Sequence, residues 1–170
     1  MKNLRFILTF AIAVWVGFAL EILPWVQTEI VKPYIKGVAL ACGFFIKLFG
    51  GSATINGAVI QNPTNGFGVE IANGCSGLEV LILLGAAVVA FNSASIKQRF
   101  VGFLMCSVAI LSINAIRIIS LFYIGQYSKW FFDWAHLYIW DTLIIIDGIV
   151  VYILWIRWFL SSQNKAHAVR

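Results

Sequence analysis

The sequence predicts an all-α integral membrane bundle of about four transmembrane helices, with an interfacial amphipathic helix and a small β-meander on the outer face. Three observations lead to this fold class. The 170 residues are 61% hydrophobic and only 11% charged, whereas soluble domains are about 45–50% apolar and about 25% charged. Long apolar runs alternate with short segments that carry most of the lysines and arginines. Only residues 50–73 replace the helical pattern with turn-rich, β-branched sequence.

Four apolar runs approach the length that a helix needs to cross a bilayer, which is ~20 residues. They cover approximately residues 6–23, 77–91, 100–123 and 138–160. The first run follows Lys2 and Arg5 and lacks a convincing small-residue cleavage site. We therefore expect an uncleaved first span rather than a secretory signal. With no linker or internal repeat, residues 1–170 are predicted to form a single membrane domain.

The run at residues 33–49 is ambiguous, because it is about long enough to cross but contains Lys36 and Lys47. These lysines are three helical turns apart and share one face, which is typical of an amphipathic helix lying in the interface. If the segment lies flat, every basic cluster falls on the cytoplasmic side together with both termini. If it crosses, the N-terminal basic pair and the later basic loops face opposite sides. The positive-inside rule therefore favours the flat arrangement.

Residues 52–72 are expected to form the β-meander. Their short β-branched or alternating stretches are separated by Asn56-Gly57 and by residues 62–66, which are strong turn signals. The meander delivers the chain to a polar stretch at the head of the second span.

That polar stretch, residues 73–79, holds Cys75 between two glycines. A helix N-terminus carries free N–H groups and the positive end of the helix dipole, and both favour a thiolate. Glycines also allow another backbone to come close. We therefore interpret Cys75 as a candidate nucleophile at a membrane surface. The other two cysteines, Cys42 and Cys106, are interpreted as packing residues.

Two further polar residues are expected at the same depth as Cys75. Arg117 lies near the outward end of the third span, and His136 immediately precedes the fourth. Charges within a membrane usually face the bundle interior and mark function. The three residue types match the roles of nucleophile, electrostatic stabiliser and acid/base. The sequence thus predicts one catalytic site from Cys75, Arg117 and His136.

Three other residues are candidates for supporting roles in this site: Asn114, Glu79 and Ser76. Asn114 precedes Arg117 by one turn on the same helix face and is expected to orient it. Asp141 and Asp147 lie in the fourth span. The sequence does not decide whether they pair with His136 or with water.

Two other classes of function remain open on the residues alone. A structural Glu79–Arg117 ion pair would suit a non-enzymatic membrane assembly or transport component. A thiol redox relay would require a second cysteine near Cys75, but the sequence has no CxxC pair. No metal or organic cofactor is expected, because no ligand cluster accompanies the histidines. The net charge of +5 reflects membrane orientation rather than nucleic-acid binding.

The motif at residues 73–78 (Asn-Gly-Cys-Ser-Gly-Leu), followed by residues 114–118 (Asn-Ala-Ile-Arg-Ile) and then His136, resembles the exosortase/archaeosortase family of membrane cysteine enzymes. The resemblance lies in motif, order and spacing, and it covers most of the chain after the predicted interfacial helix. It implies a Cys75–Arg117–His136 site that faces away from the cytoplasm. It also implies cysteine endopeptidase or transpeptidase activity.

The resemblance further implies the partners and the location of the protein. Its substrates would be proteins with a C-terminal tripartite sorting signal, made of a short motif, a membrane helix and a basic tail. The chain is similar to the compact bacterial forms of the family, which implies the inner (plasma) membrane, contact with lipid and a periplasmic site. It has fewer spans before the cysteine than many members, and this difference bears on how a substrate helix is held. No oligomeric state is predicted.

Overall fold

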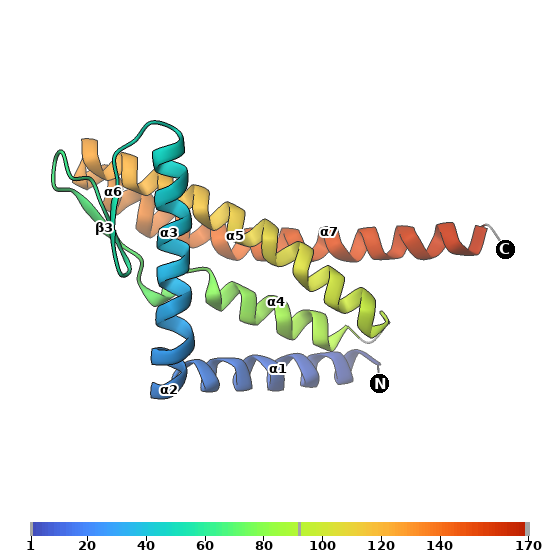
Figure 1. The fold of residues 1–170 in the computed structure, drawn as a ribbon. Helices are drawn as coiled ribbons and strands as arrows, with labels where there is room; N and C mark the ends of the chain where they lie inside the picture. The colour runs from blue at the N-terminus through green and yellow to red at the C-terminus, as the bar shows by residue number, and fades with distance from the viewer. Residues whose placement is uncertain (1, 92, 169–170) are drawn as a thin grey trace.

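The computed structural model describes residues 2–91 and 93–168, with side chains for residues 4–91, 93–140 and 142–161. It is mainly helical, with one small sheet at one end (Figure 1). The helices are α1 (Lys2–Glu21), α2 (Pro24–Val26), η1 (Gln27–Val31), α3 (Lys32–Leu48), η2 (Asn73–Cys75), α4 (Leu78–Ala90), α5 (Ile96–Tyr127), α6 (Lys129–Trp134), η3 (Ala135–Trp140) and α7 (Asp141–Ala168). The strands are β1 (Thr54–Asn56), β2 (Val59–Gln61) and β3 (Gly68–Glu70).

Among the residues that the structure describes, three helical segments are long and apolar enough to cross a membrane, judged by length and composition: Leu4–Glu21, Ile96–Tyr127 and Lys129–Ser161. Helix α4 is also apolar but has only 13 residues. It packs against α1, α5 and α7, so the four helices form one bundle. The first turn of α1 and the last turns of α7 lie on the same side of this bundle, and the sheet and α6 lie at the opposite end (Figure 1).

The interior of the bundle is apolar and closely packed. Val80, Leu84 and Val88 of α4 meet Cys106 of α5 and Trp155 of α7 in one buried cluster. Many large apolar side chains on α1, α5 and α7 point outward and are exposed. An exposed apolar surface of this extent marks a membrane interaction site.

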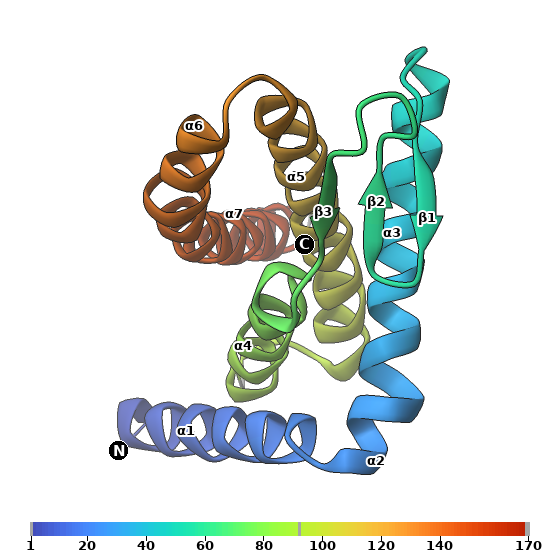
Figure 2. The ribbon, with the colours of Figure 1, turned by 90° about the vertical axis from the view of Figure 1, so that its left-hand side faces the viewer.

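Helix α3 runs across the direction of α1, α4 and α7 (Figures 1 and 2). Its buried residues recur every three to four positions, which places them on one stripe. They are Ile35, Ala39, Cys42, Gly43 and Ile46. Lys36 and Lys47 are exposed. The helix is therefore amphipathic, as the lysine spacing predicts.

The three strands form an antiparallel sheet in the order β1-β2-β3. The register pairs Ile55 with Ile60 and Ile60 with Val69, so these side chains share one face. That face packs on α3 and α5 in a second apolar cluster. Gly43 permits the contact, because a Cβ there would collide with Ile55. The sheet is thus fixed to α3, with β3 lying nearest to α5 (Figure 2).

The outward ends of the helices differ from the predicted span limits. Helix α5 continues past residue 123 to Tyr127, and α6 begins only two residues later. Gly125 lies within α5, where a Cβ would collide with Phe67 of the β2–β3 connection. The hydroxyl of Ser128 then accepts a hydrogen bond from the Phe131 N–H and caps α6.

Candidate active site

Cys75 ends the 3₁₀ turn η2 and does not start α4. Gly77 adopts a φ of +80°, a backbone conformation that favours glycine. The chain turns there, and α4 begins at Leu78. The thiol therefore stands on a short turn above the helix rather than within its first turn, and the neighbouring side chains set its surroundings.

Two side chains fix this turn. Ser76 is fully buried, and its hydroxyl donates to the Asn73 carbonyl at 2.8 Å and accepts from the Leu78 N–H at 3.3 Å. The hydroxyl of Tyr34 on α3 donates to the Ser76 carbonyl at 3.0 Å. Burial raises the pKa of Tyr34, which keeps the phenol protonated as a donor. Ser76 thus holds the backbone beneath Cys75.

Arg117 reaches the sulfur from α5. Its Nη2 donates to Cys75 Sγ at 3.8 Å, and its side chain is only 2% exposed. Because α5 continues to Tyr127, Arg117 lies deeper below the helix end than the sequence predicts. A buried guanidinium acts strongly on neighbouring groups, since the low dielectric around it screens its charge poorly.

His136 reaches the sulfur from η3. Its Nε2 lies 3.9 Å from Cys75 Sγ, and its ring stacks on Phe132 with centroids 5.9 Å apart and planes 17° apart. Among the described side chains, none forms a hydrogen bond with His136 Nδ1, which is buried. His136 belongs to η3, a π-helical turn within a longer helical rod. Such turns occur frequently at functional sites.

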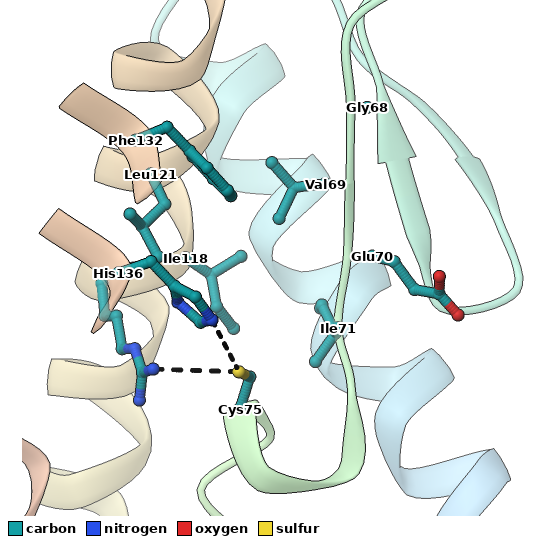
Figure 3. A pocket seen from close by; sticks show the side chains of 10 residues that line it. Gly68, Val69, Glu70, Ile71, Cys75, Ile118, Leu121, Phe132 and His136 are labelled. Atoms are coloured by element: carbon teal, nitrogen blue, oxygen red, sulfur yellow. Dashed lines mark hydrogen bonds between the residues drawn. The ribbon is translucent and has the colours of Figure 1, made fainter. Parts of the chain in front are cut away.

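The three groups share one cavity of about 300 Å³ (Figure 3). Cys75 and His136 face each other across it, and Val69 and Phe132 stand on either side further along (Figure 3). The lining residues are Gly68, Val69, Glu70, Ile71, Cys75, Arg117, Ile118, Leu121, Phe132 and His136. One cavity therefore combines a thiol, a guanidinium and an imidazole with an apolar wall and a strand backbone.

Asn114 lies directly behind the site. Its side chain is 2% exposed and lies 3.4 Å from the position that a Cβ on Gly77 would take. Among the described residues, neither amide atom of Asn114 has a hydrogen-bond partner. Asn114, Arg117 and Asp147 line a second cavity of about 10 Å³, close to the smallest volume that holds one water.

Glu79 takes a different position from the one that a structural ion pair requires. Its carboxylate stands 3.6 Å from the place of a Cβ on Gly74. The described contacts include no ion pair between Glu79 and Arg117, and Arg117 contacts the sulfur instead. The side chain of Asp141 lies outside the described residues.

Sequence reasoning missed two residues of this site. Tyr34 gave no local signal, because its contact with Ser76 arises only when α3 packs across the bundle. Phe132 precedes His136 by one helical turn, and this spacing would place the two rings together on a helix. The signal was therefore present for Phe132, but the segment before residue 138 was not predicted as helical.

The fold and the site together define a multi-pass helical membrane protein with a Cys–Arg–His cluster in a cavity at one end of the bundle. A sequence model of the transmembrane exosortase family matches residues 2–156, and the chain belongs to this family. The family resemblance of the motifs is thereby confirmed. Exosortases are in general membrane enzymes that sort proteins. No curated protein and no solved structure matches the chain.

Proposed function

We propose that this chain is a membrane-embedded cysteine endopeptidase or transpeptidase that cleaves proteins with a C-terminal tripartite sorting signal. One observation carries the proposal: Arg117 Nη2 and His136 Nε2 lie 3.8 Å and 3.9 Å from the same sulfur. A nearby cation favours the thiolate, and an imidazole within reach can accept and return a proton. Membership of the exosortase family supports the class of substrate.

In the first half of the reaction, the Cys75 thiolate attacks the carbonyl carbon of the peptide bond just before the substrate's membrane helix. Electrons move onto the carbonyl oxygen, and Arg117 donates hydrogen bonds to the oxyanion that forms. The imidazolium of His136 then gives its proton to the amide nitrogen. The C–N bond breaks, which leaves a thioester on Cys75 and a free amine on the helical fragment.

In the second half, the neutral imidazole of His136 takes a proton from the acceptor. The acceptor attacks the thioester carbon, Arg117 again stabilises the oxyanion, and the C–S bond breaks to regenerate the thiolate. Water as the acceptor gives hydrolysis. An amine or a lipid-linked nucleophile gives transpeptidation with the same three residues.

The proposed topology has four spans, with α3 in the outer interface, both termini in the cytoplasm and the site on the outer side. The first turn of α1 and the last turns of α7 lie on the same side of the bundle, which supports this topology (Figure 1). The exposed lysines and buried stripe of α3 suit an interface. Helix α4 has only 13 residues, fewer than the ~20 of a full span. Cys75 would therefore lie below the outer surface, within reach of a substrate's anchoring helix.

The competing class, a non-enzymatic assembly or transport component, draws no comparable support. It was based on a structural Glu79–Arg117 pair, whereas Arg117 contacts the sulfur and Glu79 stands beside Gly74. A redox relay has no better basis, because Cys42 and Cys106 are both buried in other parts of the fold.

The test is to co-express the protein with a membrane-anchored reporter that ends in a tripartite signal and to follow the reporter's size on gels. We expect Cys75→Ala to abolish processing, because no other thiol lines the described cavity. Cys106→Ala is the matched control, since it removes a thiol from the bundle interior, and we expect it to process the reporter normally. Processing by the Cys75→Ala protein would refute the mechanism.

A further inference from the structure

Strand β3 has an open edge whose hydrogen-bonding groups can be assigned. The Asn62 N–H donates to the Phe67 carbonyl at 2.8 Å, and the Ile71 N–H donates to the Ala58 carbonyl at 3.0 Å. The register pairs Ile60 with Val69 between these two bonds. In an antiparallel ladder, successive residues turn their backbone groups alternately toward and away from the partner strand.

The backbone groups of Phe67, Val69 and Ile71 therefore face β2, and those of Gly68 and Glu70 face the other way. On that side, the part of the chain that the structure describes adds no further strand. No hydrogen bond from a described residue outside the sheet reaches the backbone of Gly68 or Glu70. Both residues are exposed.

The open edge borders the candidate active site. Gly68 and Glu70 line the same 300 Å³ cavity as Cys75, and Phe132 and His136 lie on its other side (Figure 3). In Figure 3, the chain descends from Gly68 past Val69 and Ile71 to the turn that carries Cys75. A peptide lying beside β3 would therefore lead directly to the sulfur.

We propose that the open edge of β3 binds the substrate's cleavage segment as an added, fourth strand, and this rests on the function proposed above. Strand addition derives affinity from main-chain hydrogen bonds, so it suits any extended peptide. Open strand edges are otherwise a liability that proteins cover or block. Here the edge faces a cavity with room for a peptide beside the nucleophile.

The bound peptide runs parallel to β3. Under the proposed topology, β3 leads from the outer end of the fold toward the first turn of α4. The substrate's C-terminal helix must enter the membrane in the same direction. In a parallel pair, one peptide residue donates its N–H to the Gly68 carbonyl and accepts from the Glu70 N–H. The next peptide residue along makes no bond with the edge.

The first experiment uses the full-length, native protein and acetylated polyalanine chloromethyl ketone, a peptide that alkylates thiols and has small side chains. We expect it to alkylate Cys75 at least roughly tenfold faster than chloroacetone, since each net hydrogen bond is worth a few-fold to tenfold. Methylating each alanine nitrogen in turn should slow the reaction at alternate positions only. Alkylation by the peptide no faster than by chloroacetone would overturn the proposal. So would a slowing by N-methylation that does not alternate along the peptide.

The second experiment changes the edge itself. Glu70→Pro removes the outward N–H without removing a bond to β2, and proline is tolerated on edge strands in this orientation. Its matched reference is Glu70→Ala, which lacks the same carboxylate but keeps the N–H. We expect alkylation by the peptide to be roughly tenfold slower in the proline variant than in the alanine variant. The rate with iodoacetamide, which contacts no strand, should be the same in both.

Equal peptide rates in these two variants would overturn strand addition while leaving the cysteine mechanism intact. Processing of the reporter by Cys75→Ala would instead remove the mechanism, whatever the peptide rates. The two proposals therefore fail in different experiments.

Discussion

Arg117 is a buried cation that donates a hydrogen bond to the Cys75 sulfur. Its planar guanidinium can direct more than one N–H toward developing charge, whereas a lysine supplies a single, strongly hydrated ammonium on a flexible stem. At the residue scale, an arginine at position 117 therefore differs from a lysine in the shape of its charged group, although both carry one positive charge.

We expect Arg117→Lys to lower kcat about 10²–10³-fold, with a smaller change in KM, because oxyanion donors act mainly on the transition state. The measurement is the rate of reporter cleavage at saturating and low reporter concentrations. Arg157→Lys is the matched control, because Arg157 is exposed near the far end of α7. An undiminished kcat in Arg117→Lys would contradict the assigned role.

The cysteines differ in their surroundings, and this difference predicts a labelling pattern. Cys42 is fully buried, and burial raises its pKa to about 11, so at pH 8 roughly one Cys42 thiol in a thousand is ionised. Cys75 is half-buried and borders the cavity. Only the thiolate reacts, so we expect iodoacetamide at pH 8 to modify Cys75 and to spare Cys42.

Peptide mass spectrometry after alkylation measures this pattern. Raising the pH toward 11 should increase labelling of Cys42, because its ionised fraction rises up to that pH. Cys75→Ser should remove the label seen at pH 8, and Cys42→Ser should not. Labelling of Cys42 as fast as Cys75 at pH 8 would contradict the assignment.

At the scale of single elements, Gly77 links the turn that carries Cys75 to α4. Its φ of +80° costs any other L-residue about 1–2 kcal/mol, and a Cβ there would lie 3.4 Å from Asn114. We expect Gly77→Ala to lower the unfolding temperature in detergent and to slow reporter cleavage, because the backbone beneath Cys75 must shift.

Gly37→Ala makes the same chemical change in the interior of α3. Nothing lies within 4 Å of its Cβ position, and alanine is the better helix former. We expect this variant to be equally or more stable, by up to about 1 kcal/mol. Equal unfolding temperatures for the Gly37 and Gly77 variants would show that the turn at Gly77 carries no constraint.

Elements differ in how far the sequence predicts them. The lysine spacing and apolar stripe of α3 follow from helical periodicity, and the turn signals around Gly57 separate β1 from β2. The start of α4 at Leu78 depends instead on the backbone conformation of Gly77, which composition does not show. The helix that carries His136 was missed because its aromatic residues are equally typical of an interfacial loop.

The whole molecule orients the site by placing it at one end of the bundle. The proposed topology predicts that the N- and C-termini both lie in the cytoplasm. Green fluorescent protein, which folds to its fluorescent form in the cytoplasm, should fluoresce when fused at either end. Alkaline phosphatase, which is active only outside, should be inactive at either end. Opposite results at the two ends would mean that α3 or α4 does not have its proposed placement.

Motif order predicted three residues of the candidate site, and the structure brings Cys75, Arg117 and His136 together. The sequence could not show what joins them, because the links connect distant parts of the chain. Tyr34 holds the Ser76 carbonyl across the bundle, and β3 forms one cavity wall. These contacts depend on how α3 and the sheet pack, which no local pattern encodes.

The wide turn η3 has a consequence for the chain length between His136 and α7. Both belong to one continuous helical rod. The angle about the helix axis between the imidazole of His136 and the packing face of α7 is therefore fixed. Each residue of an α-helix turns the chain by about 100°, and each residue of a wider π-helical turn such as η3 turns it by less. Deleting a single residue between His136 and Asp141 would aim the ring away from the sulfur while α7 kept its neighbours. In this segment, natural variation should therefore change residue types more readily than residue count.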